Sequence, residues 1–508
     1  MPTPSHNDYL NTPTLDQVVG AFDRLANDLW SENLERTYWI SGNTLHSAVN
    51  FILAGVEAEA GWLEGQGSRL PVIQKMIADA YAYHQKTFND SGLWYDDQTY
   101  WGIVLLKVHE NFSTLSGGAD TITNGTVTVN ADDCLNACLQ SWSFVQKAWD
   151  ARVLHAQDAP VKGGCWNYCN KYGVQNTVTN CMYLLLSIRL FQALGKLDGS
   201  SSPPRSVITD LVRQEALRFT CKIFYWLRSW IFLDKTGPHQ DSRVVLVNNM
   251  NNDEVKDGSG KALWLTRDTA YPQPSASTQA VAALEQGAIM EAMVTMLAHQ
   301  ADVTVCFDSP ELQSYIGSAS YGKAFEADAK EILANLDRGC REALFHNQGS
   351  IQEPQFVLQD WPFQLLYDDS YGLDESTSKG LFMRYWARVI PEMSTYVKGQ
   401  IPASYLQDAQ ALVKQTAAAV WATRSSQAGS LHQLSPNWAD SQGREAFIAQ
   451  FQKTWAIDPG TYKSSNTEYS SANQIYSNSA SKQANAQMAN FVSQSIGLDA
   501  LTAYMSQL

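Results

Sequence analysis

The chain has 508 residues, of which 17% are charged and 11% are aromatic, with 16 Trp and 22 Tyr. A disordered chain would show the opposite balance, so this is a folded protein that is long enough to bury a large core. Its 36 Lys and Arg stand against 51 Asp and Glu, a net charge of −15, and no basic cluster offsets it. Nucleic acid is therefore excluded as a favoured partner. A neutral polar polymer fits better, because sugar rings stack on aromatic side chains and their hydroxyls pair with Asp, Asn and Gln.

The chain ends and the cysteines bear on where the protein works. No run reaches the roughly 18 apolar residues of a membrane span. The first residues do not resemble a signal peptide, and the last do not resemble a lipid-anchor tail. Eight cysteines and Asn-x-Ser/Thr triplets at Asn89, Asn111 and Asn124 favour a glycoprotein with one or two disulfides. We expect a secreted, extracellular protein whose signal peptide has been removed; a cytosolic chain with buried thiols is the alternative.

Apolar residues recur at spacings of three and four along most of the chain, which predicts helices rather than strands. The predicted helices cover 14–30, 44–63, 72–88, 99–112, 134–153, 177–194, 206–231, 277–300, 321–344, 376–396, 403–423, 444–455 and 482–506. Segments rich in Gly, Asn, Pro and Ser separate them. These segments are longer than ordinary helix connections, and long ordered loops often carry function.

This pattern predicts an all-α fold. About a dozen antiparallel helices make six hairpins, which can close into an (α/α)6 barrel, a six-hairpin toroid; periodicity alone leaves an open solenoid as the alternative. We expect a single domain over residues 1–508. Within it, 1–13 is an N-terminal arm and 457–481 is a Ser/Asn-rich loop before the last helix.

Several catalytic motifs are absent from the sequence. It contains no HExxH, no His pair at metal spacing, no GxSxG and no GxGxxG. "DGSGKA" (257–262) lacks the first glycine of a phosphate loop and the Ser or Thr after its lysine. "NNMNNDEVKD" (248–257) lacks the Gly and the terminal Glu of an EF-hand loop. We expect neither a metal nor an organic cofactor.

Three Asp-Asp dipeptides, at 96–97, 132–133 and 368–369, are the acids to weigh. Acids often open helices, because a carboxylate caps free N–H groups and meets the positive end of the helix dipole. This structural interpretation prevails for 132–133, and it applies to 96–97 as well. The residues around each pair must therefore indicate whether the pair is catalytic or only caps a helix.

The pair at 96–97 differs from the others in its neighbours. Trp94, Tyr95, Tyr100 and Trp101 flank it, and such walls both stack sugar rings and raise the pKa of a carboxyl by desolvation. Adjacent helix residues point about 100° apart, so both carboxyls can border one pocket. Retaining glycosidases hold two carboxyls about 5–5.5 Å apart, one as nucleophile and one as acid and base, and a neighbouring pair fits that spacing better than the wider inverting one.

The segment "YDDQTYWGIVLL" (95–106) resembles the Tyr-Asp-Asp-(Gln/Asn)-x-x-Trp signature of glycoside hydrolase family 76, the α-1,6-mannanases and related fungal wall enzymes. Further segments similar to that family follow in the same order, over a match from about 15 to 505. They are "GGCWNYCNKYGVQNTVTN" (163–180), "LEQGAIMEAMVTM" (284–296), "STSKGLFMRYWARV" (376–389) and "SSQAGSLHQLSPNWA" (425–439). The ordered set is more specific than any one motif.

The resemblance implies an (α/α)6 barrel and a retaining double displacement without a cofactor. By analogy Asp96 is the nucleophile that forms a glycosyl-enzyme intermediate, and Asp97 is the acid that protonates the leaving sugar and then the base that activates water. The residues alone support the pair without ordering its members. Departures from the family pattern at Tyr100, Asn167 and Leu284-Glu285 leave the exact substrate open.

Six residues are predicted to bind substrate: Trp101, Trp166, Asn180, Gln286, Asp368 and Asp369. For Trp166 the equal alternative is packing in the core, and for the pair at 368–369 it is an Asx-type turn. Lys379 and Arg384 are predicted to neutralise nearby acids such as Asp374 and Glu375 rather than to touch substrate.

Together these observations predict a monomeric, endo-acting retaining glycosidase that hydrolyses α-1,6 linkages in mannan or in other mannose-rich cell-wall glycans. One alternative is a cell-wall transglycosidase, which shares the glycosyl-enzyme intermediate but passes the sugar to another sugar. The other is an inactive carbohydrate-binding protein on the same toroid. We expect a polysaccharide or oligosaccharide partner, with neither nucleic acid nor a membrane span.

Overall fold

The computed structural model describes part of the chain in detail. The described residues are 12–35, 38–58, 69–88, 94–149, 163–167, 175–196, 207–228, 247–248, 253–254, 264–266, 269–271, 283–317, 321–347, 356–358, 373–424, 432–434, 438 and 482–507. The predicted helix at 444–455, most of the expected arm at 1–13 and the loop at 457–481 lie outside them. The single domain expected over 1–508 stays a prediction.

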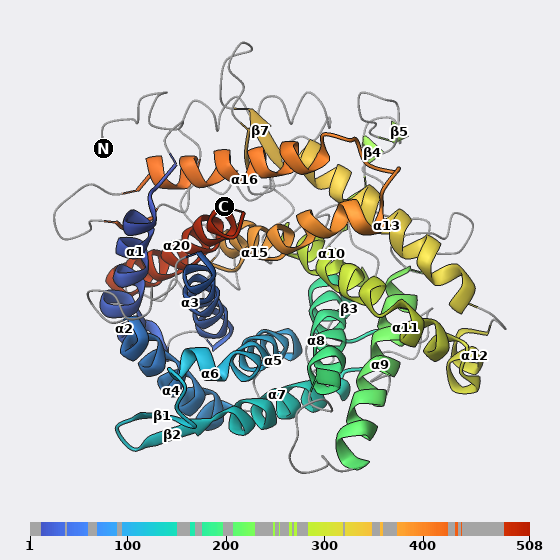
Figure 1. Cartoon of the computed structure of the whole chain (residues 1–508), viewed down its shortest axis with the longest axis horizontal. Helices are drawn as coiled ribbons and strands as arrows, with labels where there is room; N and C mark the ends of the chain where they lie inside the picture. The colour runs from blue at the N-terminus through green and yellow to red at the C-terminus, as the bar shows by residue number, and fades with distance from the viewer. Residues whose placement is uncertain are drawn as a thin grey trace.

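Six helices form a closed inner layer around the axis of the molecule (Figure 1). They are α3 (Tyr38–Ala58), α5 (Tyr95–Glu110), α8 (Thr177–Lys196), α10 (Ala283–Ala298), α15 (Leu373–Tyr396) and α20 (Lys482–Met505). Each packs against the next one in chain order, and α20 packs back against α3. The layer is therefore a closed toroid and not an open solenoid.

An outer layer of helices alternates with the inner one along the chain. Its members are α1 (Leu15–Asp23), continued by the π-helical η2 (Arg24–Leu29) and α2 (Trp30–Asn33), then α4 (Arg69–Thr87), α7 (Ala131–Gln146), α9 (Val207–Leu227), α13 (Gly322–Ala343) and α16 (Tyr405–Ala422). Each outer helix packs on the inner layer. This alternation of outer and inner helices confirms the predicted all-α (α/α)6 toroid, and it makes the inner helices run in one direction.

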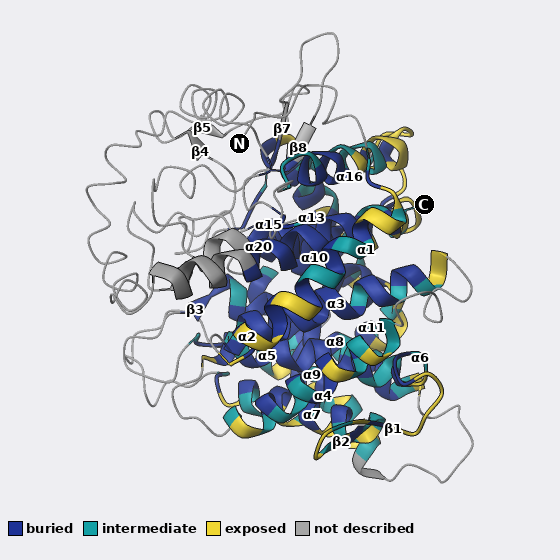
Figure 2. Ribbon diagram, turned by 90° about the vertical axis from the view of Figure 1, so that its left-hand side faces the viewer, coloured by how far each residue is buried: buried dark blue, intermediate teal, exposed yellow. Residues whose placement is uncertain are grey.

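The burial pattern follows the two layers (Figure 2). Inner helix α10 is buried at every position from Ala283 to Leu297, as expected for a helix that is apolar on all sides. Outer helix α13 instead buries one stripe that includes Phe325, Ala329, Ile332 and Leu336, at spacings of three and four. The core is therefore the shared wall between the layers together with the lining of the axis.

A buried ion pair and its hydrogen bonds join the first inner helix to the last two. The guanidinium of Arg384 on α15 donates to both carboxylate oxygens of Asp499 on α20, at 3.0 and 2.8 Å. It also donates to the Asn43 side chain at 3.1 Å, to Ser47 Oγ at 2.8 Å and to His46 Nδ1 at 3.0 Å, all on α3. Arg384 does neutralise an acid, and that acid is Asp499; the side chains of Asp374 and Glu375 lie outside the described part of the chain.

Short elements lie between the long helices or at their ends. They are the helices α6 (Phe112–Leu115), α11 (Gln300–Phe307) and α12 (Pro310–Ile316), and the paired strands β1 (Thr121–Asn124) with β2 (Val127–Asn130), β3 (Gln175–Asn176) with β6 (Thr269–Tyr271), β4 (Val247–Asn248) with β5 (Asp253–Glu254), and β7 (Phe345–Asn347) with β8 (Phe356–Leu358). The β1–β2 hairpin turns through Gly125 at φ +60°, a conformation that glycine adopts without steric cost.

Where they are described, the cysteines are mostly buried and the glycan acceptors are partly exposed. All seven described cysteines are free thiols, so the expected disulfides are not found among them; Cys169 lies outside the described residues. The Asn111 and Asn124 amides donate to Lys107 O and to Asp79 Oδ1, each at 2.8 Å. Secretion and glycosylation stay predictions, the latter also at Asn89, which is not described.

One described helix, α8, is long and apolar enough to cross a membrane by length and composition. However, 78% of its most apolar stretch is buried inside the protein. Since the inner helices α5 and α10 and the outer helix α9 pack against it, α8 is a core helix of the toroid.

Candidate active site

The two predicted catalytic acids open an inner helix. Asp96 and Asp97 lie in the first turn of α5, and both are partly exposed. The N-cap residue is Trp94, which has an extended backbone, makes no side-chain cap and is 45% exposed. The positive end of the helix dipole favours the charged form of both carboxyls. The acids are thus held on a rigid helix end, beside an aromatic side chain that solvent can reach.

Asp96 stands on the face of α5 that lines the axis of the toroid. Tyr100, Ile103 and Lys107 follow it at spacings of four, seven and eleven, which place them on one side of a helix. Burial, and then the negative charge of Asp96, raise the pKa of Tyr100 well above its usual range. The ring of Tyr100 lies 5.5 Å from that of Trp39, at the start of α3. An aromatic layer therefore separates Asp96 from the deeper part of the axis.

A short loop at 163–167 holds the start of α5 in place. The backbone N–H of Tyr95 donates to Asn167 O at 3.0 Å. The Asn180 side chain grips the same loop, because its Oδ1 accepts from Cys165 N at 2.8 Å and its Nδ2 donates to Cys165 O at 3.0 Å. Since Asn180 lies in the first turn of α8, it ties the start of that helix to the start of α5. This arrangement makes Asn180 a positioning residue.

Gly164 is required in this loop. It has φ +82°, and a Cβ at that position would lie 2.5 Å from the Trp226 indole. A side chain there would be strained and would push against a fully buried tryptophan on α9. The glycine therefore lets the loop lie close to the helix layer.

A network of buried polar side chains holds the first turn of α5, on which the acid pair lies. Gln98, the residue after Asp97, accepts through Oε1 from Tyr38 Oη at 3.3 Å and from Ser141 Oγ at 3.1 Å. The Tyr38 hydroxyl also lies 2.6 Å from His84 Nδ1. Burial lowers the pKa of His84 to about 3, so its imidazole is neutral at physiological pH. The network links α3, α4, α5 and α7, and the prediction from sequence missed it although Gln98 belongs to the motif.

Two predicted aromatic contacts lie in the core. Trp101 is fully buried; its indole donates to Tyr38 O at 3.0 Å and stacks on His84 with ring centres 5.1 Å apart. Trp166 is 3% exposed, and its backbone N–H donates to Ala148 O at 3.3 Å. A sugar would reach either indole only after neighbouring residues moved. Of the aromatic residues beside the acids in the described part of the chain, Trp94 is an exposed one.

Gln286, which was predicted to bind substrate, also hydrogen-bonds to the protein backbone. Gln286 is fully buried on α10; its Nε2 donates to Thr266 O at 3.1 Å and its Oε1 accepts from Thr266 N at 2.8 Å. Glu285, beside it, accepts from Thr266 Oγ1 at 3.2 Å. Gln286 thus fixes the segment 264–266 at the start of α10, much as Asn180 fixes 163–167 at the start of α8.

The remaining candidates are placed as follows. Asp368 and Asp369 lie outside the described residues, so their predicted role in a subsite stays a prediction. Lys379 is buried, and its ammonium lies 4.7 Å from the centre of the Trp438 ring. No group of three or more His, Cys, Asp or Glu side chains within the described ranges is arranged to hold a metal.

Eight solved chains match this one, and three of them are described here. The chain is similar to glycoside hydrolase family 76. A family 76 glycoside hydrolase from a bovine Bacteroides thetaiotaomicron strain aligns with TM-score 0.47 and 13% identity, over 88% of this chain and 79% of that one. The Lin0763 protein of Listeria innocua gives 0.43 and 12%, over 86% and 95%. A family 76 α-mannanase from Bacteroides thetaiotaomicron gives 0.38 and 10%, over 87% and 93%.

No family model and no curated protein matches the chain. At identities of 10–13% the structural similarities do not transfer an activity. The function must therefore be inferred from the chain's own residues.

Proposed function

We propose that this protein is a retaining endo-glycosidase that hydrolyses α-1,6-mannosidic linkages in mannan or in mannose-rich cell-wall glycans. The observation that carries the proposal is the adjacent pair Asp96-Asp97 in the first turn of an inner helix of an (α/α)6 toroid, partly exposed and beside an exposed Trp94. The order of motifs shared with family 76 supports the same reaction and the same substrate class. The lack of charge in mannan suits a protein with a net charge of −15.

The mechanism needs two carboxyl groups with different duties. Asp96 attacks the anomeric carbon and forms a glycosyl-enzyme intermediate, while Asp97 protonates the leaving glycosidic oxygen. In the second step Asp97 removes a proton from water, which hydrolyses the intermediate and restores the configuration. Two features suit this division: Asp96 is on the face that lines the axis, and the Asp97 backbone N–H donates to Asp96 Oδ1 at 3.2 Å. This hydrogen bond orients the carboxylate that serves as nucleophile.

The substrate would lie across the face of the toroid where the inner helices begin. Trp94 offers a flat apolar surface there for a sugar ring. An extracellular location, as expected from the sequence, agrees with a polymer substrate that does not enter cells. Asp368 and Asp369 would extend the acidic surface for further sugar units.

The test is the stereochemistry of the first product released from linear α-1,6-mannan. Proton NMR at early times should show the α-anomer before mutarotation, with internal chain cleavage in the size profile. A β-anomer at early times would overturn the retaining mechanism. An added mannose acceptor separates the rivals, since a transglycosidase yields longer products. Saturable binding of mannan without any bond cleavage would replace the enzyme with a binding protein.

A further inference from the structure

A second polar cluster lies deeper on the axis, away from the acid pair. Its pocket is lined by His46, Ile103, Leu106, Lys107, Glu110, Leu185, Arg189, Glu291, Tyr385 and Arg388, from five of the inner helices. Lys107 is eleven residues after Asp96, or about 16 Å further along α5. The proposed hydrolysis uses none of these side chains. The function of the cluster must therefore be inferred separately.

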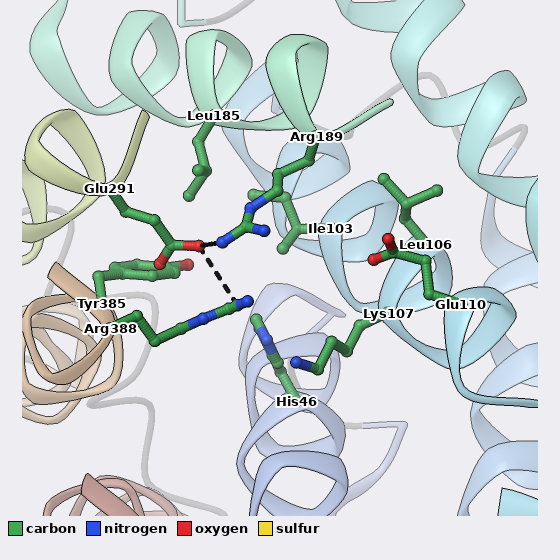
Figure 3. A pocket seen from close by; sticks show the side chains of 10 residues that line it. All are labelled: His46, Ile103, Leu106, Lys107, Glu110, Leu185, Arg189, Glu291, Tyr385 and Arg388. Carbon is green, nitrogen blue, oxygen red and sulfur yellow. Dashed lines mark hydrogen bonds and ion pairs between the residues drawn. The ribbon is translucent and has the colours of Figure 1, made fainter. Parts of the chain in front are cut away.

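The cluster holds more positive than negative charge. Glu291 is 4% exposed and lies between Arg189, with which it forms an ion pair, and Arg388, whose Nη1 is 3.3 Å from Glu291 Oε1 (Figure 3). Glu110 instead pairs with Lys196 at 3.1 Å. Within the part of the chain that the structure describes, Lys107 makes no ion pair. One arginine and the Lys107 ammonium thus remain without a matching carboxylate.

His46 adds a neutral donor to the same wall. Its Nδ1 lies 3.0 Å from Arg384 Nη1 and must accept from it, because a guanidinium can only donate. Burial, and then the charge of Arg384, lower the pKa of His46 well below its usual range, so the ring is neutral and carries its proton on Nε2. Figure 3 shows the His46 ring beside the Lys107 and Arg388 head groups.

The size of the pocket limits what can fill it. About 20 Å³ is open to the centre of a water-sized sphere, and one water needs about 10–15 Å³ on this measure. The side chain of Arg388 is 40% exposed, which opens the pocket to solvent. A monatomic anion fits this space, whereas a sugar ring does not.

We propose that the pocket between Lys107, Arg189 and Arg388 is a binding site for a small inorganic anion of the halide type, such as chloride. Glu291 is a single carboxylate beside three cations, Lys107, Arg189 and Arg388. The anion supplies further negative charge to balance them. It ties α5, α8 and α15 together at the opposite end of the axis from the acid pair. The site does not depend on the proposed glycosidase activity.

Titration of Lys107 gives the site a defined pH dependence. Burial, followed by the charges of Arg388 and Arg189, lowers the pKa of Lys107 to about 7. The groups that face it are Arg189 on α8, Arg388 on α15, Glu291 on α10, Glu110 on α5 and the neutral His46 on α3. Only the ammonium form attracts an anion, so halide affinity should fall as the pH rises above about 7.

Two measurements on the full chain test the site. A bromide-soaked crystal should show an anomalous peak between Lys107, Arg189 and Arg388; a peak elsewhere only, or none, overturns the proposal. In solution, replacing gluconate by chloride at constant ionic strength and pH 6 should raise the thermal unfolding midpoint by about 1–3 °C. The shift should shrink at pH 8.5.

Matched variants separate the site from a general salt effect. Lys107→Met and Arg388→Gln should each abolish the chloride-dependent shift, and the second serves if the first does not fold. Lys86→Gln, at a lysine that is 70% exposed and paired with Glu35 on the outer surface, should keep it. An equal shift in all four proteins would show that no specific site exists.

Discussion

Two Asp-Asp pairs lie in the first turns of two helices, α5 and α7, and the N-termini of these helices are capped differently. At α7 the N-cap Asn130 accepts from Asp133 N at 2.8 Å, and Asp133 Oδ2 accepts from Asn130 N at 2.9 Å. This is a capping box, in which the Asp133 carboxylate caps the helix. At α5 the N-cap is Trp94, whose side chain makes no cap.

The difference shows that the N-cap residue decides whether a side-chain cap forms at the helix that an acid pair opens. An Asn three positions before an acid directs the carboxylate back to the helix backbone. A Trp side chain in the same place cannot accept from the helix N–H groups, and the pair at 96–97 lies beside an exposed aromatic side chain. The pair at 132–133 caps a helix, and we propose that the pair at 96–97 is catalytic.

The sharpest test of this comparison replaces each acid by its amide. Asp96→Asn and Asp97→Asn should each lower kcat/KM on α-1,6-mannan by about 10³–10⁴-fold, or roughly 4–5.5 kcal/mol of transition-state stabilisation. The amides keep the shape but lose the nucleophile or the proton donor. Initial rates and circular dichroism of each variant provide the measurement.

The matched controls are Asp132→Asn and Asp133→Asn on α7. Both should keep kcat/KM within about twofold, because neither contacts the site that the proposal needs. If these variants lost activity as strongly as the pair on α5, or if Asp96→Asn stayed active, the comparison would fail.

A smaller effect is expected where the start of α5 is held. Asn180→Ala removes both side-chain bonds to Cys165 and frees the loop that binds Tyr95 N. Because a displacement of about 1 Å can cost about 100-fold, we expect kcat to fall by about 10–100-fold. Asn33→Ala, which loses a buried amide bond to Leu29 O far from the acids, is the control and should leave kcat unchanged. Equal losses in the two variants would reduce Asn180 to a general stabilising residue.

Trp94→Ala should act mainly on binding. Loss of one stacking surface costs about 1 kcal/mol, which corresponds to roughly a fivefold rise in KM with kcat little changed. Leu211→Ala, at an exposed apolar side chain on α9, should not alter KM. A Trp94→Ala enzyme with unchanged KM would remove Trp94 from the sugar-binding surface.

The smallest effect on activity belongs to the α7 cap. Asn130→Ala should lower the free energy of unfolding by about 1 kcal/mol through loss of the capping box, with kcat/KM unchanged. Urea denaturation monitored by circular dichroism measures the first quantity and initial rates the second. A fall in activity here would mean that the two Asp-Asp pairs are not independent.

The layout of helices was predictable because the apolar spacing persists along the whole chain. The spacing does not say which helices are inner or outer, but alternation of fully apolar and one-sided helices, as in α10 and α13, contains that information. The helices α11 and α12 were missed because they are short. Ser309 followed by Pro310, an N-cap and a first-turn proline, was the available signal for α12.

The sequence predicts the acid pair and places it at a helix start, but most of the residues that hold that helix start were not predicted. Trp101 looked like a sugar platform because it lies close to the acids, yet four residues after Asp97 it packs into the wall between α3 and α4. Asn180 was predicted to bind substrate. Its side chain hydrogen-bonds to the backbone of Cys165, in the loop at the start of α5. The partner of Arg384 is 115 residues away on the next inner helix, α20, and spacing along one helix cannot show which helices lie side by side.

Closure of the toroid has a consequence for synthesis on the ribosome. Ser47 Oγ meets Ser495 Oγ at 2.9 Å across 448 positions, and Gln494 Nε2 donates to Ala21 O at 2.8 Å across 473. At 5–20 residues per second, α3 waits roughly 20–90 s for the helix that covers it. During this time the apolar side of α3 that later faces α20 is open to water and to other nascent chains. The early helices therefore depend on chaperones, or on temporary contacts with one another, until translation reaches α20.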